Sequence, residues 1–208
     1  MDEPLTRSRA RLEKSQLRAE RILEAALEVF AQKGYRDAAI DDIAIASQTS
    51  KGGVYFHFPN KQAIFLRLLD QMAHLLLSRA EQAMAAEPDP LRKGDAALLT
   101  MLRTFAGHRR LTRLFLVEAL GAGREFNLKM QEIHAAFAGL ISRYLDELVA
   151  AGLIAPLDTQ IAGMAWFGGI NEVVRRWVLT GQPEHLEDAY PALRDLLRRS
   201  IGQPTDHA

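Results

Sequence analysis

The sequence predicts an all-α protein with about nine helices. Apolar residues recur at spacings of three and four, and the strict alternation typical of strands is missing. The interruptions fall at glycine, proline and residues that cap helices. With 208 residues, of which 48% are hydrophobic and 25% charged, the chain is long enough for a small domain and a larger helical core.

The breaks in this pattern place each helix in order along the chain. We expect helices at about residues 14 to 33, 40 to 46, 50 to 56, 60 to 86, 89 to 106, 109 to 120, 125 to 151, 158 to 180 and 185 to 199. Asn60 is a suitable N-cap for the fourth helix. The later breaks fall at Pro88, Pro90, Gly121, Gly123, Gly152, Pro156, Gly181 and Pro183.

The segment from Ile40 to Lys61, IDDIAIASQTSKGGVYFHFPNK, predicts two short helices joined by a tight polar turn. Ile43 and Ala44 give the first helix an apolar face, and Val54 and Phe58 do so for the second. A turn of this length sets two helices steeply across each other, as in a helix-turn-helix. The second helix can then enter the major groove of DNA.

Polar side chains on the second of these helices and at the start of the fourth helix of the chain are candidate DNA contacts. We expect Tyr55, His57 and Lys61 to bind phosphates. Residues at the start of the helix, namely Thr49, Ser50 and Lys51, are candidates for base edges, and Gly52 and Gly53 leave room for the duplex to approach. Alternatively, Tyr55 and His57 cover a small core. Four consecutive aromatic residues cannot all face inward, so at least one or two must lie at the surface.

This stretch resembles the DNA-binding domain of the TetR family of bacterial transcriptional repressors. The residues that carry the resemblance are the amphipathic helix Ala19 to Phe30, Gly34, Tyr35, Ile43, Ala44, Ser50, Lys51, Gly52, Tyr55, Phe58, Pro59, Asn60 and Lys61. Three departures are visible. Ala38 and Ala39 stand where the family usually has Ser or Thr, so Asp37 is the candidate N-cap. Gln48 replaces the turn glycine and is expected to be left-handed or to reshape the turn, and Gly53 replaces a frequent Thr.

The resemblance implies a DNA-binding regulator, most simply a repressor, that binds a pseudo-palindromic operator as a homodimer. We expect a DNA-binding domain at residues 1–60 and a helical effector-binding and dimerisation domain at residues 61–208. The fourth helix begins at the DNA-binding residues and spans nearly 40 Å at 1.5 Å per residue. It is therefore the expected coupling element between the two domains.

The C-terminal half has no convergent acid–base or nucleophile pattern, so we expect no enzyme. Its inward-looking apolar positions are Met72, Leu76, Met101, Leu102, Phe105, Phe115, Met130, Ile133, Phe137, Trp166 and Ile170. Such residues are usually plain core, but the family resemblance implies a cavity enclosed by helices four to eight that binds a small, mostly apolar effector. Polar residues that could orient it are His108, Glu118, His134 and Asn171.

Helices eight and nine are the expected dimer face. Glycines interrupt helix eight at Gly163, Gly168 and Gly169, which is costly unless backbones approach closely. Helix nine carries an apolar stripe of Leu186, Ala189, Tyr190, Leu193, Leu196 and Leu197. The two helices could form the four-helix bundle that the family uses for dimerisation. Alternatively, the stripe of helix nine packs only on its own chain.

The segment Trp166 to Gly181 resembles more narrowly the TetR-family regulators of fatty-acid degradation, whose effectors are acyl-CoA thioesters. An acyl-CoA is therefore the first candidate effector, with another apolar or aromatic small molecule as the alternative. Arginines that could meet CoA phosphates are Arg103, Arg109, Arg110 and Arg113. These arginines could equally be solvated helix ends.

Charge and composition exclude several other functions. The net charge is zero, which disfavours a sequence-nonspecific nucleoid-type DNA binder. The segment from Leu5 to Arg21 is nevertheless basic, with six basic and two acidic residues. That basic segment can follow phosphates or be a solvated terminus. The chain has no cysteine and no HExxH motif, so we expect neither metal nor cofactor. It has no apolar signal core or membrane span, which predicts a cytoplasmic protein.

Overall fold

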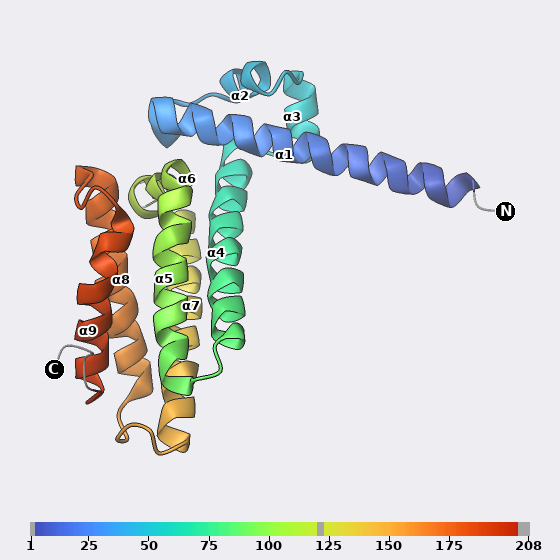
Figure 1. The fold of residues 1–208 in the computed structure, drawn as a ribbon. Coiled ribbons are helices and arrows are strands. Elements are labelled where there is room, and N and C mark those ends of the chain that lie inside the picture. The colour runs from blue at the N-terminus through green and yellow to red at the C-terminus, as the bar shows by residue number, and fades with distance from the viewer. Residues whose placement is uncertain (1–2, 120–122, 204–208) are drawn as a thin grey trace. The chain divides into compact units, whose positions relative to one another are not determined.

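A computed structural model describes residues 3–119 and 123–203, with side chains from residue 13 onward, and every regular element in these ranges is a helix. The helices group into two compact units that divide between Gln71 and Met72. This division lies inside α4 (Lys61–Ala86), whereas the sequence placed the boundary where that helix begins. Figure 1 shows the order of the helices along the chain.

The N-terminal unit consists of α1 (Glu3–Asp37), α2 (Ile40–Ala46), α3 (Lys51–His57) and the first turns of α4. Its core is built from fully buried side chains of all four helices, which include Ile22, Phe30, Ile43, Val54, Ile64 and Phe65. The ring of Phe65 lies 5.4 Å from that of Phe30 and 4.8 Å from that of Tyr35. These contacts explain why the first turns of α4 belong to this unit.

The turn between α2 and α3 has the conformation expected of a helix-turn-helix. Gln48 is left-handed with a φ of 52°, which is the first of the two alternatives that the sequence left open. The hydroxyl of Ser50 accepts a hydrogen bond of 3.1 Å from the main chain of Gly53 and so caps α3. Asn60 caps α4 in the same way, because its side chain accepts a bond of 2.8 Å from the main chain of Ala63.

The prediction that Asp37 caps α2 is wrong. Asp37 is the last residue of α1, and Ala39 occupies the N-cap position of α2. The main-chain N–H of Ala39 donates to the carboxylate of Asp42 at 3.1 Å, which is the reciprocal half of a capping box. A carboxylate three residues into the helix therefore replaces the missing cap side chain.

The C-terminal unit continues from α4 through α5 (Pro90–Gly107), α6 (Arg109–Arg113), α7 (Arg124–Ala150), α8 (Thr159–Thr180) and α9 (Tyr190–Ser200). A π-helical turn, Leu114–Glu118, follows α6, and a 3₁₀ turn, Leu186–Ala189, precedes α9. In Figure 1, α5, α7, α8 and α9 run alongside one another. Core residues of this unit include Leu102, Phe115, Phe137, Leu145, Val174 and Leu186.

Local sequence accounts for where these helices begin and end. Asp89 caps α5 by accepting from the main chain of Leu91 at 2.9 Å, and Asp158 caps α8 by accepting from two main-chain N–H groups. Gly181 ends α8 in the left-handed conformation, with a φ of 72°. Helix α1 begins at Glu3 and not near residue 14, and Gly121 lies outside the described residues. The predicted sixth helix is divided into α6 and the π-helical turn, and the predicted ninth begins with the 3₁₀ turn. The other predicted ends agree to within a few residues.

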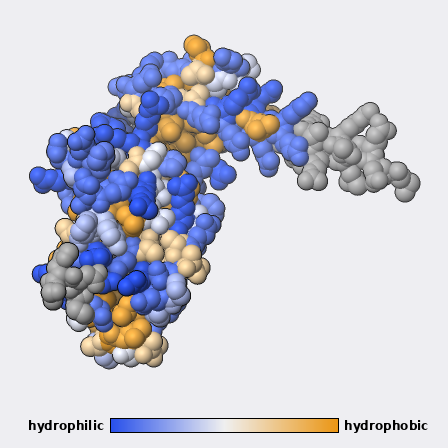
Figure 2. Space-filling view, viewed as in Figure 1, coloured by the Kyte–Doolittle hydropathy of each residue, from blue (hydrophilic) through white to orange (hydrophobic). Residues whose placement is uncertain are grey.

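The surface of the molecule varies in polarity. Figure 2 shows mainly hydrophilic residues on the displayed face of the described part of α1 and an apolar area on the C-terminal unit. Among the described helices, none combines the length and the hydropathy needed to cross a membrane.

Candidate functional site

Helix α3 presents a mixed polar and aromatic surface. Tyr55 is 46% exposed and Phe56 is 79% exposed, whereas Val54 and Phe58 are buried in the unit's core. The expectation that some of the four consecutive aromatic residues lie at the surface is therefore confirmed. Side chains that reach solvent from this helix can contact a duplex without any rearrangement of the core.

The two glycines of α3 have different surroundings. A Cβ atom added to Gly53 would lie 2.6 Å from Cγ2 of Thr49, so a larger residue would displace that side chain. A Cβ atom on Gly52 would meet no other atom within 4 Å. Packing thus gives a reason for Gly53 but none for Gly52, whose exposed position is compatible with close approach of DNA.

All three predicted base-reading residues are held by local bonds, including the Ser50 hydroxyl that caps α3. The ammonium of Lys51 pairs with the Asp41 carboxylate at 2.9 Å. The hydrogen bond to Asp41, and after it the electrostatic attraction of the negative carboxylate, raise the pKa of Lys51. The Thr49 hydroxyl donates to the main-chain oxygen of Ser47 at 3.3 Å. Lys51 and Asp41 are both largely exposed, so their ion pair contributes little free energy. Lys51 can therefore leave Asp41 for a DNA contact with little loss of stability.

Lys61 has a role in the fold that its sequence position did not indicate. Its ammonium donates to the main-chain oxygens of Tyr35, Arg36 and Ala38 at 2.7, 2.9 and 2.7 Å. It also lies 4.7 Å from the centre of the Tyr35 ring. The lysine therefore bonds to carbonyl groups of the last residues of α1 and of Ala38 just after it, where intrahelical donors run out. Its predicted contact with phosphate stays a prediction.

His57 and the exposed bases of α1 complete the candidate DNA surface. Burial, followed by repulsion from Arg18, lowers the pKa of His57 below its ordinary value. Its ring lies 5.1 Å from that of Phe56. Lys14, Arg18 and Arg21 are exposed on α1. The side chains of the bases nearer the N-terminus, Arg7, Arg9 and Arg11, lie outside the described ones.

A cavity of about 270 Å³ lies within the C-terminal unit, between α5, α7, α8 and α9. Four of the predicted effector-binding residues line it, namely Met101, Phe137, Trp166 and Ile170. Other apolar lining residues are Met84, Leu91, Leu98, Leu140, Ile141, Phe167, Leu197 and Ile201. The walls are therefore mainly aliphatic and aromatic, as in sites for small apolar ligands.

The remaining predicted effector residues do not line this cavity. Met72, Leu76, Phe105, Phe115 and Met130 are buried core residues. Among the polar candidates, Nδ1 of His108 lies 2.9 Å from the main-chain oxygen of Thr104, and Glu118 lies 4.0 Å from Arg113. Asn171 is partly exposed on α8. Inward spacing identified buried positions correctly but could not separate the wall of a cavity from solid core.

His134 is the polar candidate with an unusual environment. Its ring packs 5.0 Å from that of Phe167, and its Nε2 atom is buried without a hydrogen-bond partner. Burial lowers the pKa of this histidine. His134 therefore behaves as a neutral aromatic side chain of the helix interface near neutral pH.

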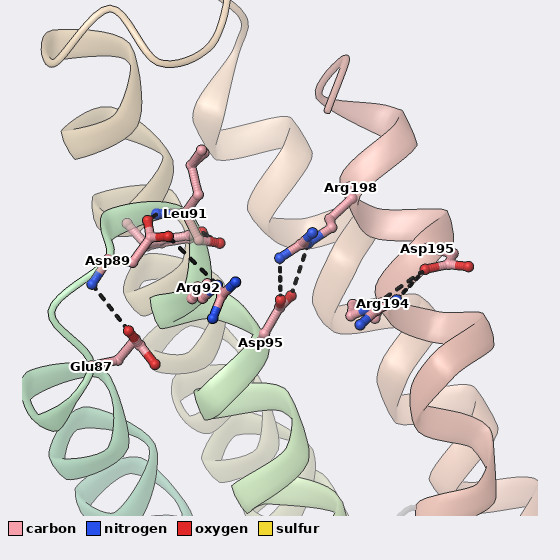
Figure 3. Close-up of polar contacts among 9 residues, drawn as sticks. Glu87, Asp89, Leu91, Arg92, Asp95, Arg194, Asp195 and Arg198 are labelled. Carbon is pink, nitrogen blue, oxygen red and sulfur yellow. Dashed lines mark hydrogen bonds and ion pairs between the residues drawn. The ribbon is translucent and has the colours of Figure 1, made fainter. Parts of the chain in front are cut away.

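One end of the cavity is polar and contains charged residues that the sequence did not single out. Arg92, Asp95, Arg194 and Arg198 line it together with Asp89. Figure 3 shows Asp95 on α5 and Arg198 on α9 pointing toward one another. The four arginines predicted for CoA phosphates, Arg103, Arg109, Arg110 and Arg113, are exposed and do not line the cavity. The guanidinium of Arg109 instead lies 4.8 Å from the centre of the Trp177 ring.

Tyr144 forms part of the cavity wall as a neutral group. Its hydroxyl donates to the main-chain oxygen of Leu91 at 3.1 Å, and burial raises the pKa of Tyr144 to about 12. A Cβ atom on Gly94 would lie 2.8 Å from the Tyr144 ring, so this glycine makes room for it. Tyr144 brings no negative charge to the cavity at physiological pH.

Helices α8 and α9 expose apolar side chains on the C-terminal unit. Ile161 is 58% exposed, Met164 54% and Leu196 63%, and Gly168 and Gly169 have no side-chain or backbone neighbour within 4 Å of an added Cβ. Of the predicted dimer residues, Leu186 and Leu193 are buried within their own chain. Tyr190 is half-buried, and Leu197 lines the cavity. The stripe of α9 is thus divided between its own core and the surface.

In the described parts of the chain, no three or more His, Cys, Asp or Glu side chains are grouped so that they could hold a metal ion.

Comparisons with known proteins agree with this geometry. Residues 22–68 match the model of bacterial regulatory proteins of the tetR family, and residues 69–199 match that of the YsiA-like protein, C-terminal region. A fatty acid metabolism regulator protein of Bacillus subtilis is 26% identical over 181 residues, which cover 86% of this chain and 93% of that protein.

Solved structures with the same fold include the fatty acid degradation regulator FadR from Bacillus halodurans. It is 25% identical with a TM-score of 0.79, over 86% of this chain and 96% of that one. FadR from Bacillus subtilis, solved in complex with stearoyl-CoA, is 24% identical with a TM-score of 0.79, over 89% of this chain and 98% of that one. With both family models matched from residue 22 to residue 199, the chain belongs to the TetR family of DNA-binding transcriptional regulators.

Proposed function

We propose that this protein is a ligand-responsive repressor that binds a pseudo-palindromic operator as a homodimer and releases it when an acyl-CoA enters the cavity of the C-terminal unit. The observation that carries the proposal is the apolar cavity between α5, α7, α8 and α9, in a unit other than that of the recognition helix. A separate cavity allows a small molecule to control DNA binding without competing for the DNA surface.

The exposed apolar surface of α8 and α9 supports the dimer. Ile161, Met164 and Leu196 present large side chains to solvent, and Gly168 lets a second backbone come close. A single α3 helix reads too few base pairs for operator-level affinity, whereas two copies at a fixed spacing read two half-sites. The dimer therefore supplies both affinity and a distance that a ligand can alter.

The relatives and the cavity walls support an acyl-CoA effector. One relative is a fatty acid metabolism regulator, and another regulator of this fold was solved with stearoyl-CoA. Met101, Phe137 and Ile170 offer apolar surface to an acyl chain, and the charged end offers arginines to an anionic group. Helix α4, which contributes residues to both units, is the proposed coupling element.

An aromatic effector is a second candidate. The rings of Phe137 and Phe167 are stacked with centroids 5.3 Å apart and an interplanar angle of 9°, and both residues line the cavity beside Trp166. Such a wall favours a planar ligand as well as a flexible chain.

The test is a titration of acyl-CoAs of increasing chain length against a preformed complex of the protein with operator DNA selected from genomic fragments. Release that depends on chain length, with none by free CoA, is the expected result. Release by an aromatic compound but by no acyl-CoA would keep the repressor and discard the acyl effector. Binding to random and selected fragments with equal affinity at fixed salt would instead indicate a nucleoid-type protein.

A further inference from the structure

An ion pair at the polar end of the cavity joins two helices that are far apart in sequence. The guanidinium of Arg198 on α9 contacts both carboxylate oxygens of Asp95 on α5, with Nη2 at 2.5 Å from Oδ2 and Nε at 3.4 Å from Oδ1. The side chains are only 17% and 18% exposed. Figure 3 shows this pair beside Arg194 and Asp195 of α9.

Such a pair stabilises the contact between two helices less than an apolar contact would. Removing two charges from water costs more than an apolar contact of the same size, and the mutual attraction of the charges only partly offsets that cost. The pair lines a cavity, moreover, and does not sit in solid core. Its position at the boundary of an apolar cavity makes the guanidinium reachable from inside the cavity.

The other charged groups around this end are also paired. Arg194 bonds to Asp195 at 3.1 Å, and Arg92 lies 3.6 Å from Asp89. Of these residues, three arginines but only two aspartates line the cavity, because Asp195 does not. Tyr144 stays neutral because burial raises its pKa to about 12. The cavity therefore offers guanidinium donors at this end and apolar surface elsewhere.

We propose that Arg198 recognises an anionic oxygen group of the effector, and that Asp95 occupies the guanidinium while no ligand is bound. This inference rests on the proposed effector role of the cavity and names the chemistry of that site. The ligand class is an apolar molecule with a carboxylate or phosphate group. The planar fork of arginine binds either group with the same two N–H directions that now face Asp95.

The neighbours of Arg198 determine how such a ligand lies. Arg194 precedes it by one helical turn on the same face of α9, so a second guanidinium stands next to the anion. Leu197 and Ile201 line the cavity on either side of Arg198 in sequence, and Trp166 and Phe137 continue the apolar wall. The negative group would lie between α5 and α9, and the tail would run along α7 and α8.

The proposal is tested with two fluorescent probes of nearly the same apolar shape. One, 8-anilinonaphthalene-1-sulfonate, is an anion, and the other, N-phenyl-1-naphthylamine, is uncharged. In Arg198→Gln we expect affinity for the anionic probe to fall at least about tenfold, the lower limit of what a hydrogen bond to a charged group contributes. In Asp95→Asn, affinity for the anionic probe should rise severalfold, because the internal competitor has gone. The uncharged probe should bind all variants alike.

Matched controls separate recognition from stability. Arg199→Gln changes the next residue of α9, which is exposed and does not line the cavity, and should bind both probes as the unmodified chain does. The double variant Asp95→Asn with Arg198→Gln leaves neither charge of the pair unpaired, so it should fold well. It should still show a reduced preference for the anionic probe over the uncharged one. Equal losses for both probes, or an unchanged preference for the anionic probe in Arg198→Gln, would overturn the proposal.

The source of the anion is found with natural ligands. If Arg198→Gln weakens palmitate more than palmitoyl-CoA, the residue recognises a carboxylate; the reverse order identifies a phosphate of CoA. Either order supports anion recognition, and equal binding of both ligands to the variant and the unmodified chain contradicts it. The probe measurements need no operator. They therefore test anion recognition by Arg198 even if no acyl-CoA releases DNA. That result would contradict only the proposed acyl-CoA effector.

Discussion

At the scale of single residues, Lys61 binds three main-chain carbonyls at the end of α1. Lys61→Met keeps the aliphatic stem but removes all three donors. We expect the N-terminal unit to lose about 1 to 3 kcal/mol of stability, because two part-buried main-chain acceptors and one exposed acceptor lose their donor. Urea unfolding of the full chain measures this loss.

Lys51→Met is the matched control, because it breaks only an exposed pair with Asp41. It should leave stability unchanged and alter operator preference. If Lys61→Met keeps full stability and instead lowers the salt slope of operator binding by about one, the lysine acts on phosphate and not on the fold.

The lowered pKa of His134 makes the stability of the protein depend on pH. Burial lowers its pKa in the folded state, so below its ordinary pKa of about 6.5 the unfolded chain binds the proton more readily. Stability is therefore highest above that pH and falls as the pH drops toward about 5. His57, whose pKa is also lowered, acts in the same direction.

His134→Phe keeps a ring against Phe167 and removes the buried Nε2 atom that has no partner. We expect its free energy of unfolding to decrease less between pH 7 and pH 5 than that of the unmodified chain. His185→Gln, at an exposed position, serves as control. Parallel curves for His134→Phe and the unmodified protein would show that this histidine does not set the pH dependence.

At the scale of elements, a close approach of backbones fixes how α7 and α8 pack. A Cβ atom on Gly163 would lie 2.5 Å from the main-chain oxygen of Ala138 and 3.2 Å from the nitrogen of Ser142. Backbone atoms cannot rotate away, so Gly163→Ala should cost about 1 to 3 kcal/mol. Gly168→Ala meets nothing within 4 Å and should instead gain up to about 1 kcal/mol of helix propensity.

Thermal unfolding of both variants decides the matter, with oligomeric state recorded because Gly168 lies on the proposed dimer face. A stable Gly163→Ala variant would mean that the two helices can move apart without cost.

The elements themselves could be predicted from the sequence, because apolar spacing and capping residues act locally. Asn60 and Gly181 mark their helix ends as expected, and Gln48 takes the left-handed conformation, one of the two alternatives that its place in the turn allowed. Contacts between distant segments could not be predicted. Asp95 and Arg198 are 103 positions apart, and nothing in the spacing of either indicates the pair.

Candidate sites follow the same division. The exposed face of α3 is visible in a short segment, so its residues were identified from the sequence. The cavity depends on how α5, α7, α8 and α9 pack, so only Met101, Phe137, Trp166 and Ile170 of the expected set line it. Inward spacing alone treats a residue of the wall and a residue of solid core alike.

At the scale of the whole molecule, the exposed apolar surface of α8 and α9 predicts a dimer. Charged residues introduced on this surface should separate its two chains. Met164→Glu with Leu196→Glu places two carboxylates on side chains that are 54% and 63% exposed, so the fold of one chain should tolerate them. Light scattering should show half the mass, and operator affinity should fall sharply because half-sites are then bound singly. Leu128→Glu, on α7 and 49% exposed, should remain dimeric. An unchanged mass for the double variant would place the interface elsewhere.

Communication between the cavity and the operator predicts a reciprocal effect on affinity. If the effector prefers a conformation in which the two α3 helices are wrongly spaced, it must weaken operator binding by the same factor by which the operator weakens effector binding. A factor of roughly 5 to 150 is usual for such coupling and suffices for regulation. Calorimetric titration of the effector into free protein and into the protein–operator complex gives one factor, and operator titrations with and without effector give the other. A factor of one in both directions would mean that ligand in the cavity leaves the spacing of the α3 helices unchanged, and that α4 does not couple the two units.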